Sequence, residues 1–466
     1  MAAWKDIPLA AKLLTNVQES ALSKGSAAME NCFTTEVGSV AAFPGMETLV
    51  TLNGNSPTYL HEWRGDLVAV SSGRVWLIGK DGSTVDVTKV QVSGGKRIIF
   101  DRTENELLMA AGGQIVRLAN AETDVLSEDA PLATHVGFID GYIVANEKDS
   151  GRFQHCAAGD FRDWNPLDVF SAEGKPDDIN AIIVTPFREL ILTGIDSIEQ
   201  FERLPNGTTP FFRRWAVGEG VLAPYTLVAV DSGTWAINKQ QEFVRMSGQT
   251  SQSASDAIGR SLESISDWTD AWAAQMNIAG QKFIVLQMPK AENIYGTEGV
   301  TFLFDYRQGR WFSLFGWTEE TGTPARWPGW SYYPLWGRHF VGGNGCVYEL
   351  KLTAFDNAGE RRRVLGRTAH INWNTPARID DVRVQVKRGV SGYDDEPPKI
   401  RIRCLRDQTK WTRWIERSLG KSGDRAQEIR LGPMGDADTF QFEWEVTQGG
   451  EVEVLGMQAL VTALER

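Results

Sequence analysis

Residues 59–88, YLHEWRGDLVAVSSGRVWLIGKDGSTVDVT, alternate between short apolar runs and small polar turns. The turns lie at Arg64-Gly65-Asp66, Ser72-Gly73 and Lys80-Asp81-Gly82. Short runs rich in β-branched and aromatic residues, bounded by Gly, Asp and Ser, are typical of strands joined by hairpins. This stretch therefore predicts three consecutive antiparallel strands followed by a further turn.

The same plan recurs along most of the chain. Further copies occupy residues 97–119, 135–157, 187–203, 227–247, 282–314 and 338–352. The copies begin roughly 40–55 residues apart, which is the spacing of β-propeller blades. A single blade cannot bury both faces of its sheet, so blades must stack around an axis. We expect an all-β protein with an irregular β-propeller of about six or seven blades.

Residues 303–314, LFDYRQGRWFSL, test this interpretation. The stretch is either an active-site turn, with Asp305 and Arg307 as reactive groups, or one hairpin of the repeat. The repeat favours the hairpin, because Asp accepts backbone hydrogen bonds in turns and Gly adopts positive φ. Asp305 and Gly309 then shape the turn, and Trp311 begins the returning strand.

Two regions depart from the repeat. Residues 253–267, SASDAIGRSLESISD, place Ile258, Leu262 and Ile265 at helical spacing and predict a short helical insert that packs on the propeller. After Phe355, a polar connector at 356–367 leads to about seven strands with alternating charged and apolar residues, a pattern typical of a β-sandwich. We therefore expect an N-terminal segment at 1–46 that packs on the propeller or closes a blade, a propeller at 47–356 and a C-terminal β-sandwich at 357–466.

Composition is that of a globular protein, since 42% of the 466 residues are hydrophobic and 23% are charged. The formal net charge is −12. Basic and acidic residues nearly balance after residue 357, so the acidic excess lies in the first three quarters of the chain. An acidic surface argues against tight binding of duplex DNA, but it does not prevent DNA from sliding past.

Neither targeting nor membrane insertion is indicated. No apolar run approaches the roughly 20 residues that span a bilayer, and Asp6 and Pro8 interrupt the pattern of a signal peptide. The cysteines, Cys32, Cys156, Cys346 and Cys404, are far apart in the sequence. This spacing favours free, buried thiols in a reducing cytoplasm.

The sequence contains no recognisable catalytic, cofactor-binding or metal-binding motif. His155 and Cys156 are adjacent, but neighbours on a strand face opposite sides, so a structural histidine is favoured over a zinc ligand. The acidic clusters 177–178 and 394–396 lie beside prolines and are best interpreted as solvated loops. A β-propeller glycosidase acting on surface polysaccharide, with paired carboxylates, remains the enzymatic alternative.

Two clusters are candidates for interactions. Residues 326–340 are unusually aromatic, and such a loop either fills a core or docks a partner. Its rings are Trp327, Trp330, Tyr332, Tyr333 and Trp336. The basic run Arg361, Arg362 and Arg363 could hold phosphate, but an interdomain linker or salt bridges between subunits are favoured.

The order of these features resembles the packaged-DNA stabilisation proteins, also called tail-nozzle or tail-hub proteins, of short-tailed bacteriophages. The resemblance rests on 31–33 (NCF) before 42–45 (AFPG), on 197–201 (SIEQF), on the insert at 253–267, and on strands from PKIRIRC to VEVLGMQALVTA. Residues 406–411, RDQTKW, depart from the family's S-D-D-G-G-x-T-W turn, which leaves the shape of that turn in doubt.

The resemblance implies a structural virion protein and not an enzyme. Such proteins form a hexameric ring below the portal and its head-to-tail adaptor ring, retain packaged double-stranded DNA, and pass it without sequence-specific binding at ejection. Tail fibres, spikes or needle proteins attach nearby, and the virion is assembled in the host cytoplasm. A host propeller that binds other proteins is a further alternative, which the aromatic cluster alone does not exclude.

Overall fold

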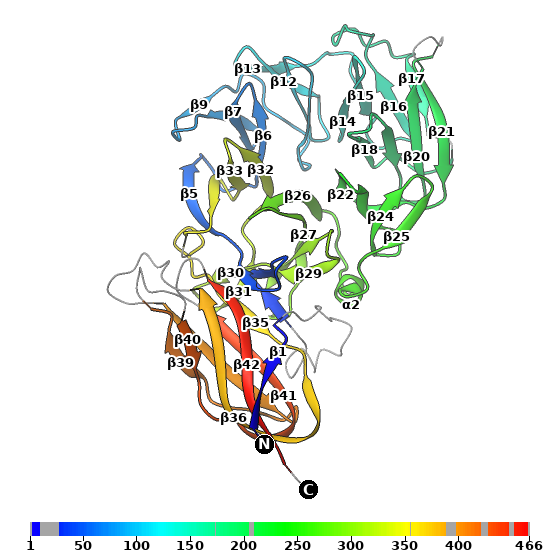
Figure 1. The fold of residues 1–466 in the computed structure, drawn as a ribbon. Helices are drawn as coiled ribbons and strands as arrows, with labels where there is room; N and C mark the ends of the chain where they lie inside the picture. Colours follow the sequence, from blue (N-terminus) through cyan, green and yellow to red (C-terminus); the bar gives the residue numbers. More distant parts are fainter. Residues whose placement is uncertain are drawn as a thin grey trace.

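The computed structural model describes residues 2–9, 28–172, 174–204, 209–354, 356–387, 398–420, 427–446 and 452–464. Short sheets form a ring, and a longer sheet domain extends from one side of this ring (Figure 1). Both chain ends lie at the far end of the extension (Figure 1). The two parts are therefore a propeller and a C-terminal sheet domain.

Six blades are formed by strands that follow one another in the chain, and the first five of them are separate four-stranded sheets. The first two consist of β6 (Thr58–Trp63), β7 (Asp66–Ser71), β8 (Arg74–Ile78) and β9 (Thr84–Asp86), and of β10 (Ile99–Arg102), β11 (Leu107–Ala110), β12 (Val116–Ala119) and β13 (Glu122–Val125). The third and fourth consist of β14 (Val136–Ile139), β15 (Tyr142–Asn146), β16 (Arg152–His155) and β17 (Val169–Ser171), and of β18 (Ala181–Val184), β19 (Leu190–Thr193), β20 (Ile198–Arg203) and β21 (Phe211–Val217). The fifth consists of β22 (Val221–Val230), β23 (Gly233–Asn238), β24 (Phe243–Ser247) and β25 (Thr250–Ser253).

The last two blades complete the ring. The sixth consists of β26 (Trp272–Ile278), β27 (Gln281–Glu292), β28 (Glu298–Asp305) and β29 (Arg310–Ser313). The seventh consists of β32 (Ser331–Leu335), β33 (Arg338–Gly342), β34 (Cys346–Lys351) and β5 (Gly45–Thr51), and its β32 packs against β6 of the first blade. Because β5 precedes the first blade in the chain, its pairing with β34 closes the ring. The described residues thus form seven four-stranded blades, which confirms the predicted propeller.

Apolar side chains between neighbouring blades hold the ring together. Between the fifth and sixth blades, Phe243 packs against Phe304 and Trp311. The helix α2 (Gly259–Glu263) lies at this junction, and its buried Leu262 belongs to the same apolar cluster. The buried Ile258 and Ile265, which flank the helix, join that cluster as well. The short helical insert is therefore confirmed, and it packs on the propeller.

The turn at 305–310 has the geometry of a hairpin. One carboxylate oxygen of Asp305 accepts hydrogen bonds from the backbone N–H groups of Arg307 (3.0 Å) and Gln308 (2.9 Å). Gly309 has a φ of 65° and donates its N–H to the carbonyl of Asp305 at 2.8 Å. Because the carboxylate is occupied by the turn's own backbone, Asp305 is part of the scaffold.

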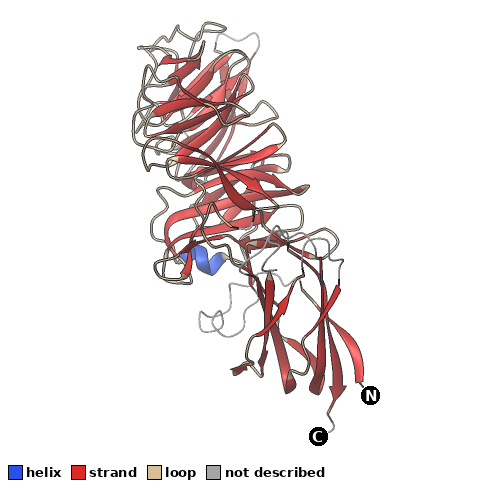
Figure 2. Cartoon of the chain, turned by 90° about the vertical axis from the view of Figure 1, so that its left-hand side faces the viewer, coloured by secondary structure: helices blue, strands red, loops and turns tan. Residues whose placement is uncertain are grey.

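The C-terminal domain has two layers of strands (Figure 2). Its strands are β35 (Val364–Arg367), β36 (Ile371–Lys387), β37 (Lys399–Arg406), β38 (Lys410–Trp411), β39 (Ile415–Ser418), β40 (Gln427–Arg430), β41 (Gly435–Val446) and β42 (Glu453–Ala463). The long β36 pairs with β41 through its first half and with β40 and β42 through its second half, so it joins the two layers. Phe442 and Trp444 are buried in this core with Ile402 and Val384. This arrangement confirms the predicted β-sandwich.

The N-terminal strands connect the two parts of the molecule. They are β1 (Ala2–Ile7), β2 (Ala28–Glu30), β3 (Cys32–Thr34) and β4 (Val40–Ala42). We expected residues 1–46 to pack on the propeller or close a blade. In the structure β1 and β4 pair with β42, whereas β2 pairs with β35 on one side and with β29 of the sixth blade on the other. A separate hairpin of β30 (Phe315–Thr318) and β31 (Thr323–Arg326) lies between the sixth and seventh blades.

Candidate functional site at the propeller junction

The three consecutive arginines lie in the connector that enters the C-terminal domain, immediately before β35. Arg362 is buried and donates to the backbone carbonyl of Phe43. Burial lowers the pKa of Arg362 to about 10. The guanidinium of Arg361 lies 4.7 Å from the ring centre of Trp317, a cation–π contact. Both residues thus make contacts within the chain.

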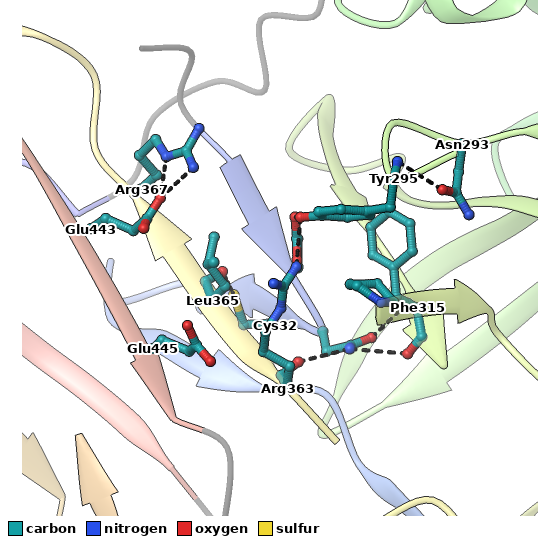
Figure 3. Close-up of polar contacts among 12 residues, drawn as sticks. Cys32, Asn293, Tyr295, Phe315, Arg363, Leu365, Arg367, Glu443 and Glu445 are labelled. Carbon is teal, nitrogen blue, oxygen red and sulfur yellow. Dashed lines mark hydrogen bonds and ion pairs between the residues drawn. The ribbon is translucent and has the colours of Figure 1, made fainter. Parts of the chain in front are cut away.

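Arg363 forms a partly buried polar cluster with Tyr295 (Figure 3) and with the buried Glu30. Its guanidinium pairs with the Glu30 carboxylate and lies 2.5 Å from the Tyr295 hydroxyl, which itself donates to Glu30. Burial opposes the charge of Arg363, but Glu30 and Tyr295 outweigh burial and raise the pKa of Arg363 above its ordinary value. Burial and the Glu30 charge also raise the pKa of Tyr295. The cluster joins β2, the sixth blade and the connector through charge-assisted hydrogen bonds.

Asn31, next to Glu30, links β2 to the connector and to the first residue of β30 through its side-chain amide. Its Nδ2 donates to the carbonyls of Arg363 (2.8 Å) and Phe315 (3.0 Å), and its Oδ1 accepts from the Phe315 N–H at 2.9 Å. Asn31 has a φ of 53°, a left-handed conformation that asparagine tolerates better than most residues. Asparagine therefore fits both the backbone and the hydrogen-bonding demands of this position.

A second set of charged residues lies along the C-terminal sheet. Glu443 on β41 is buried between Arg367 of β35 and Arg403 of β37, which pair with it from either side. The Arg403 guanidinium lies between the rings of Trp411 (4.3 Å) and Trp414 (4.4 Å). Cation–π contacts and ion pairs thus hold β35, β41 and β37 together across the outer face of the sheet.

The predicted aromatic cluster is divided between the core and the rim of the seventh blade. Trp327 is buried, and its ring packs edge-on against Phe43 at a centroid distance of 6.4 Å. Tyr332 is also buried, and its hydroxyl lies 2.8 Å from His339 Nδ1. Tyr333 is half-buried beside His61, with ring centroids 4.9 Å apart. Trp327 and Tyr332 therefore contribute to the chain's own core.

The remaining two tryptophans are half-buried and contact neighbouring loops. Trp330 lies under the Arg326 guanidinium at 4.2 Å, and its indole N–H donates to Asn344. Trp336 has a φ of 56° in the turn between β32 and β33, and its indole N–H donates to the carbonyl of Gly65 in the first blade at 2.8 Å. The rings of the cluster therefore do not form one exposed patch.

The candidate metal-binding and catalytic residues that lie in the described part of the chain make structural contacts. Within them, no three His, Cys, Asp or Glu side chains are placed to hold a metal ion, and no helix is long and apolar enough to cross a membrane. Asp177 accepts from the Asp196 N–H (2.7 Å) and the Ser197 hydroxyl (2.9 Å), and so supports the turn before β20. His155 is buried, with Nδ1 2.8 Å from the carbonyl of Cys156. The acidic cluster at 394–396 lies outside the described residues.

Sequence reasoning identified the arginine run but not its partners. Glu30 and Tyr295 are 333 and 68 residues from Arg363 in the sequence and belong to no common motif. The one signal near Glu30 was the 31–33 motif, whose Asn31 is central to the junction.

Comparison with known proteins gives one family. Residues 27–354 match the family model described as "Bacteriophage P22 Gp10, beta-propeller". No curated protein matches the sequence.

Several solved structures are similar to the chain at low identity. A streptogramin B lyase structure is 9% identical, covers 66% of this chain and 97% of its own, and has a TM-score of 0.45. Virginiamycin B lyase from Staphylococcus aureus is 10% identical, with coverages of 66% and 98% and a TM-score of 0.45. The extracellular domain of a putative one-component system from B. thetaiotaomicron is 10% identical, with coverages of 86% and 61% and a TM-score of 0.44.

Proposed function

Since residues 27–354 match the model of the bacteriophage P22 Gp10 family, the chain belongs to that family of phage structural proteins, and we propose that it is the ring-forming nozzle of a short phage tail. In this proposal a hexameric ring continues the channel of the portal and the adaptor ring. It retains packaged DNA, passes it at ejection, and provides a surface for fibres, spikes or a needle. The match over 27–354 is the observation that carries the proposal.

The architecture supports assembly into a closed ring. A cyclic ring of identical chains needs two different, complementary surfaces on each copy. The chain offers a broad propeller and a laterally extended C-terminal domain (Figures 1 and 2). The polar cluster at their junction keeps the two surfaces at a fixed angle, which a ring of defined size requires.

Charge supports the passage of DNA. Each copy has a formal net charge of −12, and the acidic excess lies outside the C-terminal domain. If acidic residues line the bore, they repel phosphates and allow duplex DNA to slide without binding to its sequence.

Some residues of the two clusters identified from the sequence are proposed as partner contacts. Three aromatic residues of the cluster are half-buried: Trp330, Tyr333 and Trp336. Each of these side chains therefore has some exposed surface that can contact a neighbouring copy of the chain, the adaptor or a fibre. Arg361 is also half-buried and has the same capacity. Trp336 is the best single position to test, because it lies in the turn between β32 and β33 and is half-buried.

The test is electron microscopy of the purified chain, alone and mixed with its portal–adaptor complex. We expect rings of uniform copy number coaxial with the adaptor, and Trp336→Ser should reduce ring yield without unfolding the chain. The matched control is Tyr142→Phe on the third blade. A chain that stays monomeric in the presence of the adaptor would overturn the proposal.

A further inference from the structure

Side chains from several blades converge at one end of the propeller axis. Tyr59 and Tyr225 lie on the inner strands β6 and β22 of the first and fifth blades, and Trp272 begins β26 of the sixth. Arg97 lies just before β10, the inner strand of the second blade. Inner strands surround the axis of a propeller, so residues of distant blades meet only there.

Arg97 is at the centre of this group. Its guanidinium lies 4.5 Å from the ring of Trp272 and 5.0 Å from that of Tyr59. One N–H donates to the carbonyl of Trp330, just before the seventh blade, at 2.7 Å. A guanidinium has five N–H donors, and this is the one side-chain hydrogen bond that Arg97 makes within the described part of the chain.

The positive charge of Arg97 has no ion-pair partner among the described residues. Asp270 is the carboxylate whose charge raises the pKa of Arg97. Its ion pair, however, is with Lys290, at 3.0 Å. Burial lowers the pKa of Arg97 to about 10, which is still high enough to keep the group charged near neutral pH. Arg97 is only partly buried, and partial removal of a cation from water without a counter-ion is unfavourable.

The phenol groups of Tyr59 and Tyr225 interact electrostatically with the same charge. Tyr225 is buried, and its ring stacks on that of His135 at a centroid distance of 5.5 Å. Burial raises the pKa of Tyr225 to about 12 and also raises that of Tyr59, while Arg97 opposes both shifts. In the described residues neither hydroxyl makes a hydrogen bond, so both O–H donors are available.

We propose that Arg97, Tyr59 and Tyr225 bind a small oxyanion, a carboxylate or a phosphate, at this end of the propeller axis. A guanidinium and two phenol groups supply directed donors that match the oxygens of such an anion, and the ring of Trp272 holds the guanidinium in place. Tyr59 and Arg97 are only partly buried, so a ligand can reach them from the surface. The site is contained in one chain and does not depend on ring assembly.

Isothermal titration of the full chain with N-acetyl-aspartate amide and with inorganic phosphate tests the proposal. At least one anion should bind, and Tyr59→Phe and Tyr225→Phe should each weaken binding roughly tenfold, as expected when a hydrogen bond to a charged group is lost. Both substitutions remove only a hydroxyl, so they report on the site even if Arg97→Gln fails to fold. Binding of one anion alone identifies the source of the oxyanion as carboxylate or phosphate.

The matched control is Tyr142→Phe, because Tyr142 lies 5.4 Å from the Arg203 guanidinium on another part of the propeller. It should bind as the wild type does. The proposal is overturned if neither anion binds the wild-type chain, or if the Tyr59 and Tyr225 variants keep wild-type affinity.

Discussion

Replacing Arg363 with methionine is the sharpest test of the junction between the propeller and the C-terminal domain. The substitution keeps an unbranched apolar side chain but leaves the Glu30 carboxylate, 3% exposed, without its cation. Breaking a buried ion pair by removing one partner costs about 3–5 kcal/mol. The Tyr295 hydroxyl continues to donate to Glu30, so we expect the lower end of this range, about 3 kcal/mol.

Hydrogen exchange followed by mass spectrometry measures this loss locally, which suits a chain whose two parts need not unfold together. Amides of β2 and β35 should exchange faster in Arg363→Met, whereas those of the third blade should not change. Arg361→Met removes an arginine two residues earlier whose described contact is a cation–π contact with Trp317. It is the matched control and should cost less than about 1 kcal/mol.

A second substitution separates charge from packing. Adding Glu30→Gln to Arg363→Met removes the unpaired carboxylate, so the double variant should regain part of the lost stability. If Arg363→Met costs no more than Arg361→Met, or if the double variant is the least stable of all, the ion pair does not stabilise this junction.

Three further predictions concern stability measured by urea unfolding. Burial raises the pKa of Asp101 to about 6, so protonation of this group favours the folded state: as pH falls from 7 to 4, the unfolding free energy of the wild type relative to that of Asp101→Asn should rise by up to about 3 kcal/mol. Gly366→Ala should cost about 3 kcal/mol or more, because a Cβ there would lie 2.3 Å from the buried Trp444 ring, whereas Gly456→Ala, with its nearest neighbour at 3.8 Å, should be tolerated. Asp305→Ala should cost about 1–3 kcal/mol by leaving two turn N–H groups without an acceptor, and Asp305→Asn should cost less because it keeps a side-chain carbonyl oxygen.

The sequence was sufficient for features that depend on neighbouring residues. Turn chemistry predicted the hairpin at Asp305 and Gly309, and helical spacing predicted that Ile258, Leu262 and Ile265 share a buried face. Local signals of this kind are strong because strand alternation, turn residues and helical periodicity act over a few positions.

Long-range pairing could not be predicted in the same way. The seventh blade takes β5 from the opposite end of the propeller sequence, and no local pattern marks residues 45–51 as the partner of 346–351. The sequence also does not predict the different surroundings of the three consecutive arginines. Arg361, Arg362 and Arg363 have the same side chain, yet their surroundings differ: a tryptophan face, a backbone carbonyl and a buried carboxylate.

The buried carboxylate of Glu30 helps to fix the orientation of the propeller relative to the C-terminal domain. Backbone pairing between β2 and the sixth blade consists of a single parallel register pair, Glu30 with Ser313, which is little to hold two domains at a fixed angle. Apolar packing alone could allow them to slide, since hydrophobic contacts are not directional. The carboxylate of Glu30 and the amide of Asn31 require specific partners at specific angles, and those partners come from both domains. Directional bonds therefore supply the orientation that the short pairing lacks, and the proposed ring of identical copies would depend on that orientation.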